Sequence, residues 1–132
     1  MPLFRAPRST MVPFRSPASG QSWAVTAAAT DFANSASNRC SFSLAGYTQA
    51  RLTMRVNGVG DAGSIFKVQY STDESTWADI GCTVPADASN LQVGSWVTIP
   101  EAARTTVNLR LVGIDGAATI NGSFANIFME VR

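Results

Sequence analysis

Apolar and polar residues alternate along most of the chain that follows Gly20. Because successive side chains of a β-strand point to opposite faces, an alternation with a period of two predicts strands that are buried on one face. Polar segments rich in Gly, Asn, Asp and Ser separate these stretches and predict turns and loops. No stretch of useful length has the helical period. The alternating stretches are 23–27, 40–44, 51–56, 66–71, 77–80, 95–99, 106–111 and 124–131.

About eight short strands joined by turns are typical of two antiparallel sheets packed face to face. We therefore predict an all-β fold for residues 21–132, an antiparallel β-sandwich that is jelly-roll-like. The length of 132 residues fits one domain, and a chain of this size can bury a core without disulfides or metal ions.

The first twenty residues have a different character. Prolines stand at positions 2, 7, 13 and 17 and disfavour a helix or a central strand. A Phe-Arg-x-Pro motif occurs at 4–7 and again at 14–17, and the segment carries three arginines and no acid. We predict that residues 1–20 form an extended docking arm that contacts a partner through Phe4, Arg5, Phe14 and Arg15. The alternatives are a flexible tail, or an arm folded back on its own domain.

The last predicted strand is apolar on both faces. Phe124 and Phe128 lie on its nominally outward side, whereas Ile127 and Met129 face inward. A strand of this kind is usually covered on both sides. A loop or the arm could supply the cover, or Phe124 and Phe128 could form a subunit contact, because exposed aromatic patches mark interfaces. We treat the two phenylalanines as a second, weaker partner-binding patch.

Composition argues against most catalytic and metal-binding chemistry. The chain has no histidine, which is the commonest general base and metal ligand. Two cysteines, Cys40 and Cys82, are too few for a zinc site, and their spacing leaves open whether they form a bridge. No apolar run is long enough to span a membrane, and the N-terminus lacks the apolar core of a secretory signal. We expect no membrane association and synthesis in the cytoplasm.

The candidate motifs for chemistry are weak. The glycine-rich stretch 58–63 matches a dinucleotide-binding pattern, but a predicted strand follows it instead of the required helix. The acids are scattered, and neither Asp61 nor Asp115 has the spacing of a calcium loop. Arg51, Arg55 and Arg110 could share one outer sheet face, which is a weak footprint for nucleic acid and equally fits a solvated face or contacts to a protein partner. We predict no enzyme activity, no metal, no cofactor and no nucleic-acid partner.

Aromatic residues provide the main alternative function. Trp23, Trp77 and Trp96 could stack on sugar rings, although in a small sandwich one or two tryptophans normally fill the core. A carbohydrate-binding or host-attachment module that uses Trp77 or Trp96 is therefore the second hypothesis. The stretch 66–77 is similar to a hairpin found in many jelly-roll adhesion and carbohydrate-binding modules.

A small antiparallel sandwich with an N-terminal arm, few charges and no catalytic set resembles the decoration (cement) proteins of tailed bacteriophage capsids. The resemblance covers the architecture of the chain and no specific residue set. It implies a non-enzymatic structural protein of the virion that lies on the capsid exterior, made in the host cytoplasm. It further implies binding to the major capsid protein, often as a homo-oligomer such as a trimer, and stabilisation of the shell. A head-completion or tail component of the same virion is a third hypothesis.

Overall fold

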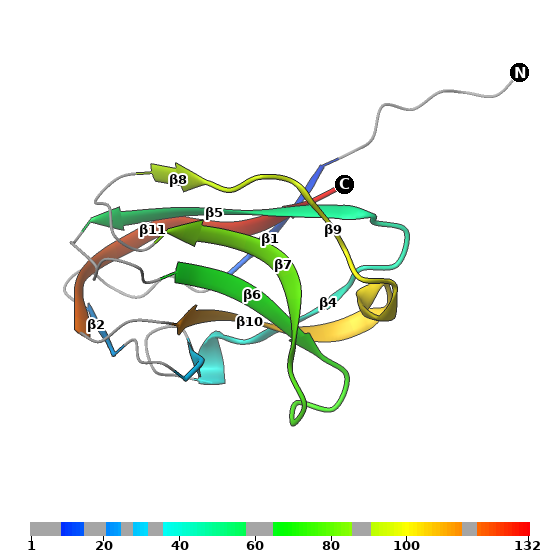
Figure 1. Cartoon of the computed structure of the whole chain (residues 1–132), viewed down its shortest axis with the longest axis horizontal. Coiled ribbons are helices and arrows are strands. Elements are labelled where there is room, and N and C mark those ends of the chain that lie inside the picture. Colours follow the sequence, from blue (N-terminus) through cyan, green and yellow to red (C-terminus); the bar gives the residue numbers. More distant parts are fainter. Residues whose placement is uncertain are drawn as a thin grey trace, which may run out of the picture.

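A computed structural model describes residues 9–14, 21–24, 28–31, 36–57, 65–85, 91–114 and 119–132. The described strands form two antiparallel sheets that pack face to face (Figure 1), which confirms the predicted all-β sandwich. Among the described residues the helical structure consists of two short 3-10 turns, η2 (Ala36–Asn38) and η3 (Glu101–Ala103).

We name the two layers sheet I and sheet II. In sheet I, β1 (Thr10–Pro13) and β2 (Gln21–Ala24) both pair with β11 (Thr119–Val131), which pairs with β5 (Gln49–Asn57), which pairs in turn with β8 (Leu91–Val93) and β9 (Val97–Thr98). In sheet II, β3 (Thr30–Asp31) and β4 (Cys40–Ser43) both pair with β10 (Thr106–Ile114), followed by β6 (Ile65–Ser71) and β7 (Ala78–Pro85).

The order of these strands is that of a jelly roll. The pairs β1/β2, β3/β4 and β8/β9 each occupy one strand position, so the described strands fill eight positions. Numbered along the chain, these positions run 1-8-3-6 in sheet I and 2-7-4-5 in sheet II. The chain therefore crosses between the layers repeatedly, and strands far apart in sequence lie side by side.

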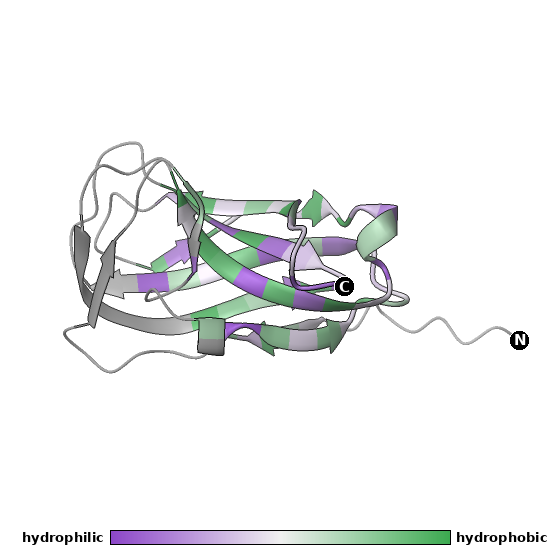
Figure 2. Ribbon diagram, turned by 90° about the horizontal axis from the view of Figure 1, so that it is seen from below, coloured by the Kyte–Doolittle hydropathy of each residue, from purple (hydrophilic) through white to green (hydrophobic). Residues whose placement is uncertain are grey.

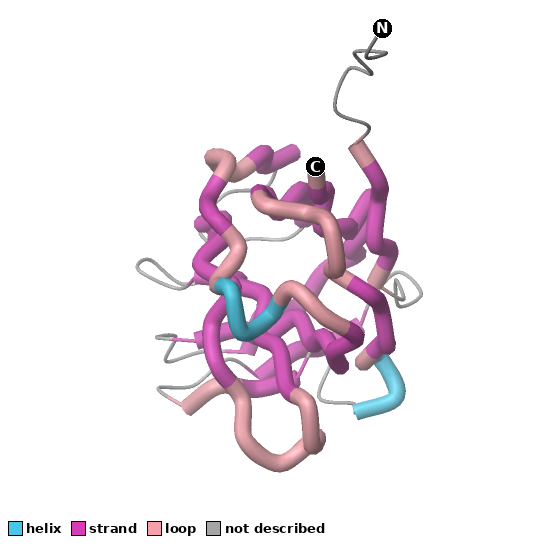
Figure 3. Tube along the Cα trace, turned by 90° about the vertical axis from the view of Figure 1, so that its right-hand side faces the viewer, coloured by secondary structure: helices cyan, strands magenta, loops and turns pink. Residues whose placement is uncertain are grey.

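The core fills the space between the two layers and follows from the alternation in the sequence. Leu52 and Met54 of β5 and Phe66 and Val68 of β6 are fully buried and point toward the opposite sheet. Figure 2 shows apolar and polar residues alternating along the described strands, and Figure 3 shows the two layers from the end of the molecule. Burial of this apolar surface is the main favourable term in folding.

The first described strand changes the predicted domain boundary. β1 pairs with the last strand, β11, from Thr10 opposite Val131 to Pro13 opposite Phe128. Val12 is 1% exposed and Phe14 is 4% exposed, and the Phe14 N–H donates to the carbonyl oxygen of Ile127 at 3.1 Å. Residues 10–14 therefore belong to the sandwich and not to a separate arm.

The prediction that Phe14 contacts a partner is wrong, because its ring is buried in the core of its own domain. Pro13 is tolerated because β1 is an edge strand, where a missing N–H breaks no central ladder. Residues 1–8 and 15–20, which include Phe4, Arg5 and Arg15, lie outside the described residues.

The two sheets approach each other closely where β7 meets the connection from β8 to β9. The Gly94 N–H donates to the carbonyl oxygen of Leu52 in β5 at 2.8 Å. A Cβ atom on Gly94 would lie 2.5 Å from the backbone oxygen of Thr83 in β7, so only glycine permits this approach. Within β7, Gly81 has a φ of +111° where the pairing with β6 shifts register, as expected for a bulge.

Replacing Phe14 with alanine tests its assignment to the core. We expect the free energy of unfolding in Phe14→Ala to fall by about 3–5 kcal/mol, because a buried ring is lost and a cavity remains. Met11→Ala, on the same strand but 61% exposed, is the matched control and should change stability by less than about 0.5 kcal/mol. Urea unfolding followed by tryptophan fluorescence measures both, and equal small effects would contradict the burial of Phe14.

Candidate binding faces

The outer face of sheet II carries a continuous polar network that joins its strand positions. Arg110 of β10 donates from Nε and Nη2 to Oε1 of Gln69 in β6, at 2.9 and 2.7 Å. Gln69 donates from Nε2 to Asp79 Oδ1 at 2.9 Å, and Lys67 Nζ lies 3.1 Å from Asp79 Oδ2. At the other edge, Asp31 of β3 lies 4.0 Å from Arg110 Nη1.

Trp77 lies against this network at the start of β7. Its ring is contacted by the guanidinium groups of Arg110, at 4.4 Å from the ring centroid, and of Arg39, at 4.9 Å. Arg39 also donates from Nε and Nη2 to both carboxylate oxygens of Asp31, at 3.1 and 2.8 Å. The indole ring and the polar groups around it are therefore already engaged within the protein.

Three charged groups of the network, Arg39, Arg110 and Asp79, have shifted pKa values. The hydrogen bond from Arg39 to Asp31 raises the pKa of the Arg39 guanidinium. Burial lowers the pKa of Arg110. Burial alone would raise the pKa of Asp79, but hydrogen bonds from Gln69 and Lys67 outweigh it and hold that pKa below its usual value. Two charged neighbours act on the pKa of Arg110 in opposite directions: Asp31 raises it and Arg39 lowers it.

The loop between β6 and β7 is fixed by Asp73. Its Oδ1 accepts hydrogen bonds from the N–H groups of Ser75 and Thr76 at 2.8 Å each, and from the hydroxyl of Ser71 at 2.9 Å. These bonds lower the pKa of Asp73, with the Thr76 N–H as the largest cause. The predicted turn between the two strands of this hairpin is confirmed, and Asp73 serves as its internal hydrogen-bond acceptor.

The outer face of sheet I has a second arrangement of tryptophan and arginine. The ring centroid of Trp96, which lies between β8 and β9, is 4.6 Å from the Arg51 guanidinium and 4.0 Å from that of Arg132. Arg51 pairs with Glu130 at 3.1 Å, and Arg132 Nε donates to Gln49 Oε1 at 2.7 Å. The Nε of Arg51 is buried and has no hydrogen-bond partner among the described residues.

Beside the Trp96 group, sheet I presents a row of side chains that crosses all its strand positions. Backbone register places Pro13 of β1 opposite Phe128 of β11, Phe128 opposite Thr53 of β5, and Thr53 opposite Val93 of β8. Val12, Ile127 and Leu52, which directly precede the row residues of β1, β11 and β5, are core residues, and Val93 is 54% exposed. The row therefore lies on the outward side of the sheet, where Thr53 is 6% exposed. We call it the apolar row.

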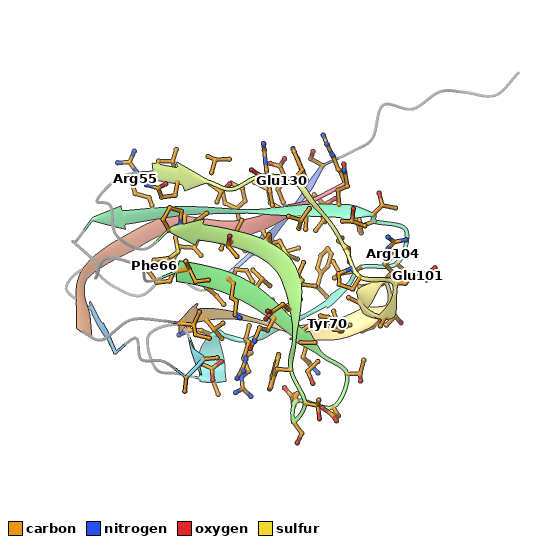
Figure 4. All side chains as sticks on the ribbon, in the orientation of Figure 1. Arg55, Phe66, Tyr70, Glu101, Arg104 and Glu130 are labelled. Atoms are coloured by element: carbon orange, nitrogen blue, oxygen red, sulfur yellow. The ribbon has the colours of Figure 1, made fainter. Side chains whose placement is uncertain are left out.

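Exposed apolar side chains gather at the apolar row. Val93 in the row is 54% exposed, and two flanking residues, Leu91 and Met11, are 45% and 61% exposed. These three are the exposed large apolar side chains of the described residues. Figure 4 shows Arg55 and Glu130 projecting from the same outer side of the β5–β11 layer. Sheet I therefore combines apolar side chains with arginines on one face.

The structure distributes the predicted contact residues unevenly. Phe128 is half-buried on the outer face of sheet I, as the pattern predicts. Phe124 pairs with Val56 through the backbone, and the placement of its side chain lies outside what the structure describes. Sequence reasoning missed Leu91 and Val93, although they alternate with Gln92, because the run is only three residues long.

The structure also bears on the predicted arginine face and on the state of the two cysteines. Arg51, Arg55 and Arg110 do not share a face, because β5 belongs to sheet I and β10 to sheet II. Cys40 and Cys82 are free thiols. Burial raises the pKa of both, that of Cys82 to about 12, so both stay protonated at neutral pH.

The described residues lack three features that would point to a small ligand, a metal ion or a membrane-spanning helix. No ligand-sized pocket opens in the described parts of the chain. No group of three or more Asp, Glu, His or Cys side chains gathers there in a way that could hold a metal ion. Within the same residues, no helix has the length and apolarity needed to cross a membrane.

Comparison with protein-family models, with curated proteins and with solved structures finds no match to this chain.

Removing the central amide of the sheet II network should weaken the fold. In Gln69→Ala we expect the free energy of unfolding to fall by about 2–3 kcal/mol, because Arg110 loses two hydrogen bonds at a site where Gln69 is 8% exposed. Gln49→Ala breaks a similar glutamine–arginine bond that is exposed, and should cost less than about 1 kcal/mol. Chemical denaturation compares the two variants, and equal losses would argue against a structural role for the network.

Acid should weaken the same network through Asp79. Since the folded pKa of Asp79 is lowered, its ionised form stabilises the protein above the unfolded pKa of about 4, and this stabilisation disappears as the pH falls through the folded pKa. Thermal melts between about pH 6 and pH 3 should show Asp79→Asn losing less stability on acidification than the wild type. The difference is small, because half of the Asp79 side chain is exposed. If stability fell equally with pH in Asp79→Asn and in the wild type, the stabilising role of ionised Asp79 would be contradicted.

Proposed function

We propose that this protein is a non-enzymatic structural protein of a virion, which decorates the outside of the capsid and stabilises it by binding the major capsid protein. The observation that carries the proposal is the anchoring of β1. Val12 and Phe14 are buried in the sandwich, so the basic segment 1–8 that precedes them is tethered to the rim of sheet I. A fixed attachment point of this kind suits a docking element.

The fold supports the proposal by analogy alone. Jelly rolls occur in viral capsid proteins, and also in lectins and other protein classes, so the fold does not assign a function by itself. The described surface offers broad sheet faces and exposed apolar side chains, which suit contact with another protein. The sequence contains no histidine that could activate one of its many serines.

Segment 1–8 can add contact area without requiring a large rigid interface. Eight extended residues reach up to about 26–29 Å, enough to cross the seam between two shell subunits. Burial of the Phe4 ring on the partner would contribute about 1.5–3 kcal/mol, and Arg5 can pair with carboxylates. Many copies on one shell then act together, and assembly of the protein as a trimer would multiply the effect.

Carbohydrate binding is the less favoured function. Sugar recognition by stacking needs an accessible ring face on Trp77 or Trp96. Each of these rings already contacts two guanidinium groups. The polar groups beside Trp77 are hydrogen-bonded to one another and would have to exchange partners to bind hydroxyl groups.

Deletion of residues 1–8 tests the proposed docking element. We expect the truncated protein to keep its melting temperature within about 2 °C, because β1 is intact, and to bind at least about tenfold more weakly to shells assembled from the major capsid protein of the same virus. Co-sedimentation with the shells measures the binding. Phe4→Ala with Arg5→Ala should reproduce most of the loss.

A deletion of residues 1–20 is the control for structure. It removes β1 with Val12 and Phe14, so it should lower stability as well as binding. Full occupancy of the shells by the protein that lacks only residues 1–8 would refute the docking role of this segment. Absence of binding by the wild type would refute the proposed function itself.

A further inference from the structure

The two outer faces of the sandwich differ in whether their side chains have partners within the protein. On sheet II the charged groups of Arg39, Asp31, Lys67 and Asp79 all have an oppositely charged partner. On sheet I, Val93 of the apolar row and Leu91 on the same strand are exposed at the β8 edge, and Met11 is exposed on β1 at the opposite edge. Between the edges the row passes through the half-buried Phe128 and through Thr53, which is 6% exposed, so the exposed apolar surface lies chiefly around Val93 and Leu91.

The charges on the outer face of sheet I are predominantly positive. Among the residues of this face that the structure describes, there is one acid, Glu130, and there are three bases, Arg51, Arg55 and Arg132, which gives a side-chain charge of +2. Among the described residues Glu130 pairs with Arg51, and Arg55 has no ion pair. Arg55 lies opposite Leu91, next to the exposed end of the apolar row. The apolar row is therefore flanked by guanidinium groups at both of its sides.

Charge identifies the kind of occupant that fits this face. A second copy placed face to face would bring two surfaces of charge +2 together, and like charges across an interface are unfavourable. Segment 1–8 of the chain carries Arg5 and Arg8 and no acid, so it is repelled from the face for the same reason. The outer face of sheet I and the basic segment 1–8 instead both complement a partner of opposite charge.

We propose that the outer face of sheet I is a docking surface for an acidic protein surface with an apolar centre, in which carboxylates pair with Arg55 and its neighbours and apolar side chains pack on Val93, Leu91 and Phe128. The proposal rests on the proposed function, because it identifies the bound surface as the outside of the capsid shell. It adds a second contact to the one made by segment 1–8, and it names the chemistry that the shell must present.

Three variants with the same change in net charge test the proposal. Val93→Asp introduces a charge into the apolar row, Arg55→Gln removes a flanking cation, and Thr106→Asp adds a carboxylate to the exposed outer face of sheet II as the control. All are measured in the full chain by co-sedimentation with shells of the major capsid protein, at two salt concentrations. We expect Val93→Asp to bind at least about tenfold more weakly, and Arg55→Gln severalfold more weakly with a reduced salt dependence. Thr106→Asp should bind as the wild type does.

The other outcomes would refute the docking face, the proposed function, or the identity of the occupant of the face. Binding by the wild type and equal binding by Val93→Asp would refute the docking face while leaving the proposed function standing. No binding by the wild type would refute both. Sedimentation of the free protein as a dimer that Val93→Asp dissociates would assign the face to a second copy. Footprinting of Leu91 and Val93 that increases on deletion of residues 1–8 would assign the face to the chain's own segment.

Discussion

One strand, β11, is paired along both of its edges and holds the two ends of the fold in register. On one side it pairs with β5, and on the other it pairs with β2 and β1. Its inward residues Ile127, Met129 and Val131 belong to the core, whereas Phe128 and Glu130 face outward. The strand therefore contributes to the core, holds β1 in place and supplies outward residues at the centre of sheet I.

The contrast between the two faces follows from where each kind of residue sits on a strand. The outward positions of sheet II hold arginine, lysine, glutamine and aspartate at spacings that let each reach the next, so the groups compensate one another. The outward positions of sheet I hold proline, phenylalanine and valine in one row. Apolar side chains of this kind are stabilised by contacts that remove them from water. The described polar groups of sheet II are therefore paired with one another, whereas sheet I leaves apolar side chains exposed to solvent.

Sequence reasoning predicted the fold class because the alternation in the long strands is strong. Leu52, Met54, Phe66 and Val68 are buried as their spacing indicates. It failed at residues 10–14, because the prolines suggested an arm, although an edge strand accepts Pro13. Local pattern also cannot show which strands become neighbours.

The candidate sites depend on that long-range pairing. The sequence predicts Phe128 as an outward aromatic residue because it alternates with Ile127 and Met129, which face inward. In the row that it forms with Pro13 and Val93, Phe128 lies opposite Pro13, which is 115 positions away in the sequence (128 − 13), so the row could not be predicted from neighbouring residues. The same holds for the three arginines, which alternate correctly within their strands but lie on two different sheets.

The pairing of β1 with β11 has a consequence for biosynthesis. A ribosome makes residues 10–14 early, yet their partner strand, residues 119–131, emerges only after nearly all the rest of the given sequence. Until then Val12 and Phe14 have no sheet to join, and folds dominated by such distant contacts form slowly. Chains that still lack residues 119–131 therefore cannot hold β1 in place by this pairing.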